Sequence, residues 1–208
     1  MGSTIEVFIL EDHLAVRAGL ELLLGRAGLS VAGVAGDVGH AHAMLTRRRF
    51  DVALIDINVP GGSGLDLVAA LLVRDPGSAV VLYTGSTDPD QLRLASRVGA
   101  RGFVLKAAPP KELLRAIRIV AAGGCYVDTR LAAALSGAMT AGAVDTLAPR
   151  EYEILVLLAD GLTSQEIAAR LGLSPQTIRS DIHKAMAALG AGTRAQVVAM
   201  IVRARMHR

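Results

Sequence analysis

Residues 52–64 read VALIDINVPGGSG, an apolar run that ends at Asp56 and continues into a glycine-rich loop. The run Val52–Ile55 has no polar face, which is typical of a strand buried on both sides of a parallel sheet. After the loop, apolar residues recur at helical spacing over Leu65–Arg74. The stretch therefore predicts a buried strand, a turn and a helix, with Asp56 at the carboxyl end of the strand.

The same alternation extends in both directions from this stretch. The expected strands are Val7–Leu10, Val31–Ala35, Val52–Ile55, Val80–Tyr83 and Phe103–Leu105. The expected helices are Leu14–Arg26, Val38–Arg48, Leu65–Arg74, Pro89–Val98 and Pro109–Ala121. Strands that alternate with helices indicate a parallel sheet covered on both faces. We predict a doubly wound, five-stranded α/β domain over residues 1–122.

The pattern changes after Gly123-Gly124. Residues 123–147 are rich in small residues, and we expect a linker there with a short helix near residues 130–136. Residues 148–208 show only helical periodicity, in Pro149–Ala159, Ser164–Leu171, Pro175–Leu189 and Arg194–Arg205. The fold class predicted for the whole chain is α/β followed by an all-α domain of four helices.

Composition excludes several classes of protein. The 208 residues are 52% hydrophobic, which is incompatible with a disordered chain. The single cysteine, Cys125, excludes an internal disulfide and is expected to be a small buried side chain. The N-terminus lacks the features of a signal peptide, and the uncharged stretch Leu131–Val144 is too short to span a bilayer. We therefore expect a cytoplasmic protein without a membrane partner.

Polar side chains follow four of the five predicted strands: Glu11-Asp12, Asp56, Thr84 and Lys106. A single Asp or Thr in such a place commonly caps the next helix, but the carboxyl ends of parallel strands meet at one edge of the sheet. Clustered carboxylates there would need a hard cation such as Mg²⁺. A carboxylate can accept a phosphoryl group, whose charge a cation, an ammonium and a hydroxyl would neutralise.

Residues 4–122 resemble the receiver domain of two-component response regulators, which has a flavodoxin-like fold. The resemblance rests on FILEDH, LIDINVPGGSGLDL, LYTGS and GFVLK in the family's order. It implies that Asp56 accepts a phosphoryl group from a histidine kinase, while Thr84 and Lys106 contact that group. It implies Mg²⁺ ligands at Glu11, Asp12, Asp56 and the backbone carbonyl of Asn58. Phe103 occupies the family's switch position, which core packing explains equally well, and Ala107 stands where many relatives have proline.

The C-terminal part contains signals for two helices joined by a short turn. Thr163 and Glu166 form a predicted capping box, Gly172 is placed to end that helix, and Ser174-Pro175 begins the next. This spacing is typical of a helix-turn-helix unit. The second helix presents a polar face that can reach bases and phosphates or can simply be solvated; its residues are Gln176, Arg179, Ser180, His183 and Lys184.

Residues 147–198 resemble the LuxR-type DNA-binding domain of the NarL/FixJ regulators, with P-R-E, E-I-A-x-x-L and S-x-x-T-I-R at the family's spacing. The resemblance implies double-stranded DNA as a partner, groove contacts from Arg179, Ser180 and His183, and a homodimer on DNA. The sequence departs from the family at Asp181, which we expect phosphate to repel. It departs again at Ala148, where the family has a capping threonine.

These interpretations combine into one function: a two-component response regulator, not an enzyme, in which phosphorylation of Asp56 controls DNA binding. We expect the unphosphorylated receiver to cover part of the Pro175–Leu189 face. The stripe Val197, Val198 and Ile201 suits either dimerisation or core packing. Two alternatives stay open: a phosphatase of the haloacid-dehalogenase type, which would need an aspartate at Asn58, and a receiver-like domain that only binds proteins.

Overall fold

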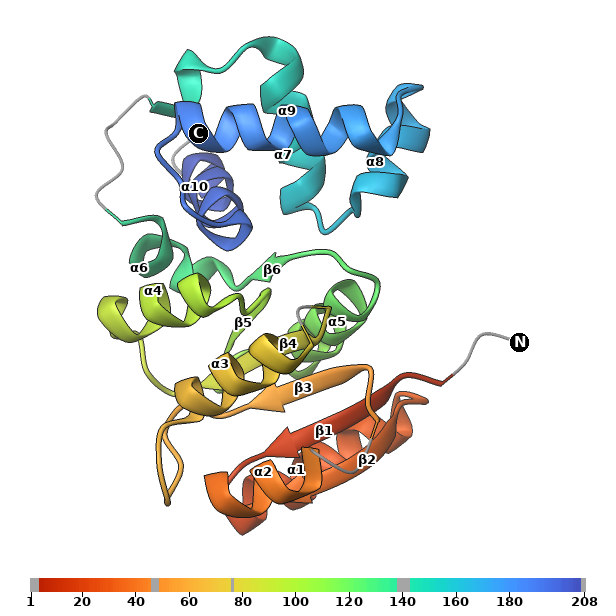
Figure 1. The fold of residues 1–208 in the computed structure, drawn as a ribbon, viewed down its shortest axis with the longest axis vertical. Helices are drawn as coiled ribbons and strands as arrows, with labels where there is room; N and C mark the ends of the chain where they lie inside the picture. Colours follow the sequence, from red (N-terminus) through yellow and green to blue (C-terminus); the bar gives the residue numbers. More distant parts are fainter. Residues whose placement is uncertain (1–3, 46–48, 76, 138–142, 207–208) are drawn as a thin grey trace.

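The computed structural model describes residues 4–45, 49–75, 77–137 and 143–206. Figure 1 shows a sheet covered by helices, with a second, helical unit stacked beside its β6 end. The parallel sheet has the order β2-β1-β3-β4-β5-β6. Its strands are β1 (Glu6–Leu10), β2 (Ser30–Ala35), β3 (Val52–Ile55), β4 (Ala79–Thr84), β5 (Gly102–Leu105) and β6 (Tyr126–Val127).

Five helices connect these strands and cover both faces of the sheet. They are α1 (Leu14–Arg26), α2 (Val38–Leu45), α3 (Gly64–Arg74), α4 (Pro89–Val98) and α5 (Pro110–Ala121). Alternate residues of each strand point to opposite faces, so two cores form. One contains Ile9, Leu54 and Val104 with residues of α1 and α5. The other contains Leu10, Ile55 and Phe103 with residues of α2, α3 and α4. The predicted doubly wound domain is confirmed, although residues 46–48 of the second predicted helix lie outside the described residues.

The prediction of five strands was wrong, because the segment expected to be a linker adds a sixth. Tyr126 pairs with Gly102 and Val127 with Phe103, in parallel with β5. A 3₁₀ turn (Thr129–Leu131) and α6 (Ala132–Ser136) follow, close to the expected short helix. Cys125, Leu131 and Leu135 are buried. The first half of the segment is thus part of the folded core, because most of its apolar side chains face inward.

The C-terminal unit has the four predicted helices: α7 (Pro149–Ala159), α8 (Ser164–Leu171), α9 (Pro175–Ala188) and α10 (Arg194–Met206). A short 3₁₀ turn, η2 (Ala143–Thr146), precedes them. The capping box is confirmed, since the Glu166 N–H donates to Thr163 Oγ1 at 3.2 Å and the Thr163 N–H donates to Glu166 Oε2 at 2.7 Å. Gly172 ends α8 at φ +67°, a left-handed conformation that favours glycine.

The two units share a continuous apolar core, and α10 lies at their junction (Figure 1). This helix packs on α6 and β6 on one side and on α7 of its own unit on the other. Val197, Val198 and Ile201 are buried there. Polar contacts also cross the junction: the Ser96 and Thr193 hydroxyls lie 2.5 Å apart, and Arg203 Nη1 donates to Ser136 Oγ at 3.2 Å. Among the described residues, no helix is long and apolar enough to cross a membrane.

Candidate functional site

Asp56 lies directly after β3, where the backbone holds its carboxylate at the sheet edge. Its own N–H donates to the Leu10 carbonyl at 2.9 Å, which aligns it with the end of β1. Its Oδ1 accepts from the Asn58 N–H at 3.0 Å. Gly64 packs so closely beneath this turn that a Cβ there would lie 2.4 Å from the Asp56 carbonyl oxygen. The side chain is 4% exposed, so the carboxylate is buried at the edge of the sheet.

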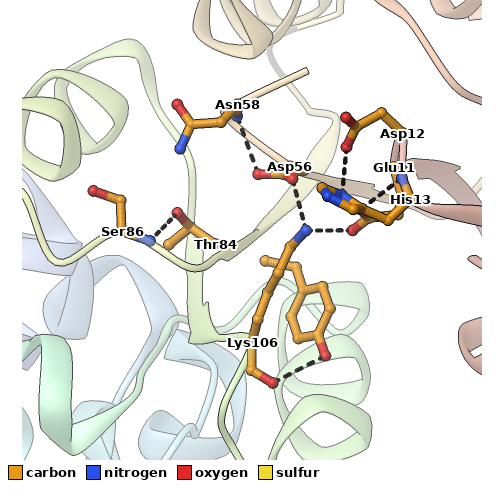
Figure 2. A network of polar contacts seen from close by, with 9 residues as sticks. Glu11, Asp12, His13, Asp56, Asn58, Thr84, Ser86 and Lys106 are labelled. Atoms are coloured by element: carbon orange, nitrogen blue, oxygen red, sulfur yellow. Dashed lines mark hydrogen bonds and ion pairs between the residues drawn. The ribbon is translucent and has the colours of Figure 1, made fainter. Parts of the chain in front are cut away.

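The Lys106 ammonium lies between two buried carboxylates, as Figure 2 shows. Lys106 Nζ is 2.7 Å from Asp56 Oδ2 and 2.6 Å from Glu11 Oε2. Burial by itself would lower the pKa of Lys106, but the hydrogen bonds with Asp56 and Glu11 outweigh it and raise that pKa above its ordinary value. Lys106 is therefore a permanent cation at neutral pH, and it neutralises one of the two negative charges beside it.

Glu11 and Asp12 stand at the end of β1, on the other side of the Lys106 ammonium. Glu11 is 1% exposed, whereas the Asp12 side chain is 25% exposed. His13 Nδ1 lies 2.8 Å from Asp12 Oδ1 and 3.1 Å from Glu11 Oε1. The strand-end residues predicted from the sequence are thus brought together. The exposed His13 ring contacts both carboxylates, and this was not predicted. His13 lies in the turn between β1 and α1, where helix or strand periodicity does not give the direction of a side chain.

Thr84 lies on β4, next to β3, and Phe103 lies on β5, one strand further along the sheet; both side chains are fully buried. Thr84 is the last residue of β4, and its Oγ1 accepts from the Ser86 N–H at 3.0 Å (Figure 2). Phe103 packs in the core on the side of α4. The Tyr83 hydroxyl donates to the Lys106 carbonyl at 3.3 Å, a contact that the sequence analysis missed.

The polar face of α9 is open in this structure. All five residues predicted to contact DNA are exposed: Gln176, Arg179, Ser180, His183 and Lys184. The opposite face is buried through Ile178, Ile182 and Ala185, so the helix is anchored by its apolar stripe. The expectation that the receiver covers the Pro175–Leu189 face was wrong for this arrangement. The junction buries α10 instead, because α6 and β6 present their apolar side chains to that helix.

Asp181 lies on α9 within an ion-paired cluster. Its Oδ2 accepts from Arg150 Nη2 at 2.9 Å, and its Oδ1 is 4.0 Å from Lys184 Nζ. The Asp181 side chain is 18% exposed, and the Arg150 side chain is 54% exposed. Arg150 comes from the first turn of α7, so the pair joins two helices of the unit.

Comparison with known proteins decides the family. Residues 7–118 match the response regulator receiver domain, and residues 145–201 match the family of bacterial regulatory proteins of the luxR type. The transcriptional activator DevR/DosR of Mycobacterium tuberculosis is 36% identical over 198 residues, which cover 92% of this chain and 91% of that protein. The transcriptional regulatory protein UhpA of Salmonella typhimurium is 38% identical over 182 residues, or 87% of this chain and 88% of UhpA.

This chain is a response regulator of the NarL/FixJ family. It is a transcriptional regulator with a receiver domain and a LuxR-type DNA-binding domain. Its fold also resembles RcsB of Salmonella enterica serovar Typhimurium, solved bound to a promoter in the presence of a phosphomimetic. The two chains are 25% identical in sequence and superpose with a TM-score of 0.59. The match covers 97% of this chain and 100% of the RcsB chain. RcsB has also been solved as dimers bound to DNA.

The family implies Mg²⁺ at the receiver site, and the side chains present fit such an ion. Glu11, Asp12 and Asp56 supply three carboxylates, and among the described residues Lys106 contacts two of them, Glu11 and Asp56. Oxygen donors with excess negative charge are what a hard cation prefers. The ligand atoms of Glu11, Asp12 and His13 lie within 4.8 Å of one another, although imidazole is a poor ligand for Mg²⁺.

Proposed function

We propose that Asp56 is the phosphoryl acceptor of this response regulator and that its phosphorylation controls DNA binding through α9. The observation that carries the proposal is the placement of Lys106 Nζ at 2.7 Å from Asp56 Oδ2, at the carboxyl edge of the sheet. If Asp56 carried a phosphoryl group, the Lys106 ammonium could bind a phosphoryl oxygen in place of the carboxylate oxygen that it binds now. The shared ammonium therefore favours both the free and the modified aspartate.

The proposed transfer is a displacement at phosphorus. One Asp56 carboxylate oxygen forms a P–O bond, and the P–N bond to a phosphohistidine of a histidine kinase breaks, with the electron pair and a proton going to the imidazole. Glu11, Asp12, Asp56 and the Asn58 carbonyl would hold Mg²⁺, which neutralises charge on the phosphoryl oxygens when bound. Lys106 and Thr84 would contact those oxygens from the neighbouring strands. The Thr84 hydroxyl can donate to one of them while its oxygen still accepts from the Ser86 N–H.

The exposed polar face of α9 supports the second half of the proposal. Arg179, Ser180 and His183 would read base edges in the major groove of double-stranded DNA, and Gln176 and Lys184 would contact the groove edge and phosphates. Arg179 Nη2 donates to Gln176 Oε1 at 3.0 Å, which orients the guanidinium before DNA arrives. A homodimer on DNA would place two such helices on two half-sites.

Phosphorylation can be tested on the intact protein with acetyl phosphate as a small donor. Wild type, Asp56→Asn and the matched control Asp66→Asn, which changes an exposed aspartate of α3, are incubated with and without Mg²⁺. We expect the mass of one phosphoryl group to be added to wild type and Asp66→Asn only when Mg²⁺ is present, and never to Asp56→Asn. Equal labelling of Asp56→Asn would refute the assignment. If wild type is labelled but its DNA binding does not change, the alternative of a receiver that only binds other proteins is favoured.

A further inference from the structure

Two residues outside both family matches lie beside the proposed phosphoryl site. Asp128 follows β6, and its side chain is 4% exposed. Arg130 forms two parallel bonds with it: Nε to Oδ1 at 3.0 Å and Nη2 to Oδ2 at 2.7 Å. Such a bidentate pair fixes the guanidinium plane. Burial by itself would raise the pKa of Asp128, but the bonds from Arg130 outweigh it and lower that pKa, so the pair stays charged at neutral pH.

Two further bonds of this pair reach the backbone on both sides of Lys106. Asp128 Oδ2 accepts from the Leu105 N–H at 3.4 Å, just before Lys106. Arg130 Nη1 donates to the Ala107 carbonyl at 3.0 Å, just after it. The Lys106 N–H itself donates to the Thr84 carbonyl at 2.8 Å. The backbone that carries the catalytic ammonium is therefore held from β4 on one side and from the Asp128–Arg130 pair on the other.

The residue that follows Lys106 is Ala107. Alanine at position 107 leaves the peptide after Lys106 without the fixed φ of a proline. A guanidinium that is locked to a buried carboxylate and bonded to the Ala107 carbonyl supplies the missing restraint. The pairing of β6 with β5 places Asp128 next to the Lys106 loop. We infer that this placement is the structural role of the short sixth strand.

We propose that Asp128 and Arg130 are positioning residues that hold Lys106 in place for phosphoryl transfer to Asp56. The inference rests on the proposed function of Asp56. Neither residue touches the phosphoryl group; both act through the backbone of the loop that carries Lys106. Misplacement of a catalytic group by about 1 Å can slow a reaction by up to about a hundredfold, so the contact is large enough to measure.

The test is the rate of Asp56 phosphorylation by acetyl phosphate and Mg²⁺ in the full-length protein, followed by intact mass. The variants are Arg130→Ala, Arg130→Lys, Lys106→Ala and the double variant Lys106→Ala/Arg130→Ala. The matched control is Arg118→Ala, because Arg118 also donates to a backbone carbonyl, that of Ala27 at 3.2 Å, but outside the site. Thermal unfolding of each variant checks that it is folded.

We expect Arg130→Ala to slow labelling about tenfold and Arg130→Lys to slow it less, because lysine keeps the charge but cannot make both sets of bonds. Arg118→Ala should label at the wild-type rate. In the Lys106→Ala background, Arg130→Ala should cause no further loss, a result that a general structural defect would not give.

Labelling of Arg130→Ala at the wild-type rate, or an equal loss with and without Lys106, would overturn the positioning role. A wild type that is not labelled at Asp56 would overturn the proposed function itself. The two failures are therefore distinguishable in one series of measurements.

Discussion

Among single residues, Asp181 poses the sharpest question, because it puts a negative charge on the helix proposed to approach DNA. In the structure its carboxylate binds Arg150 at 2.9 Å, so the pair is neutral and Arg150 is held away from other partners. An exposed ion pair of this kind contributes at most about 1 kcal/mol to stability. Its larger effect should be on DNA, since it removes one cation from those available to phosphates.

We therefore predict that Asp181→Asn strengthens binding to all DNA sequences alike. The slope of log affinity against log salt should steepen by about 0.9, as expected when one more phosphate is neutralised. Arg179→Ala, on the same helix, should instead relax the preference at one base pair. Salt titrations and selection from random DNA measure the two effects.

The control for Asp181→Asn is Asp160→Asn, which removes the same charge from a similar pair with Arg205, away from α9. It should leave the salt slope unchanged. If Asp181→Asn weakens binding, the carboxylate orients Arg150 toward DNA rather than withholding it.

At the scale of one element, α7 begins without a side-chain cap. Ala148 occupies the N-cap position with extended backbone, and only the reciprocal half of a capping box is present, since the Ala148 N–H donates to Glu151 Oε2 at 3.0 Å. The nearby Thr146 hydroxyl donates to the Ala143 carbonyl and does not cap the helix.

Ala148→Thr should complete the box and increase the free energy of unfolding by about 1 kcal/mol. Thr163→Ala, which breaks the complete box at the start of α8, should lower it by a similar amount. Thermal or urea unfolding of the intact protein measures both changes. A Tm of Ala148→Thr at or below that of wild type would mean that the exposed amides of α7 already have other partners.

The elements also show how far sequence patterns reach. The ranges Leu14–Arg26, Pro89–Val98 and Ser164–Leu171 were predicted to the residue. Apolar periodicity marks these helices, and side-chain caps from Asp88 and Thr163 begin the last two. The meeting of Glu11, Asp56 and Lys106 was predictable because parallel strands end at one edge. β6 was not predictable: two residues carry no period, and their burial depends on contacts with β5 and α10. The Asp128–Arg130 pair was missed for the same reason.

At the scale of the whole molecule, Cys125 can report whether the two units separate. It is 1% exposed beside β6, and burial raises the pKa of its thiol to about 12, far above that of a free thiol. At pH 8 the thiol is therefore neutral as well as inaccessible, and a neutral thiol is unreactive.

We predict that maleimide labels native Cys125 slowly at pH 8 and that phosphorylation of wild type accelerates labelling. Because only the thiolate reacts, the rate of labelling rises with pH, and burial raises the pKa of Cys125 and moves this rise to higher pH. While the units stay closed, the thiolate is scarce until pH approaches 12, whereas an opened state reacts once pH passes about 8.5. Asp56→Asn treated with phosphodonor is the control and should stay slow. Equal rates in both proteins would show that phosphorylation does not open the junction at β6.

The arrangement of the two units decides what phosphorylation has to change for DNA binding. The reading face of α9 is already exposed, whereas Val197, Val198 and Ile201 of α10 are buried within the chain and cannot pair with a second copy. Phosphorylation can shift the equilibrium between this closed arrangement and an open one only if it stabilises one of them more than the other. The contacts available to it include those of α10 with α6 and β6. We therefore expect phosphorylation to act on the pairing of chains rather than on access to the recognition helix.

This leads to a prediction that separates the two mechanisms. On DNA with a single half-site, affinity should be the same with and without phosphorylation of Asp56. On DNA with two half-sites, one helical turn apart, phosphorylation should increase affinity about 5- to 150-fold, the usual range of coupling between sites. Fluorescence anisotropy on both DNAs, at one salt concentration and with Asp56→Asn as control, measures the difference. An equal gain on the single half-site would mean that the receiver covers α9 in solution, because only then does one recognition helix benefit from release.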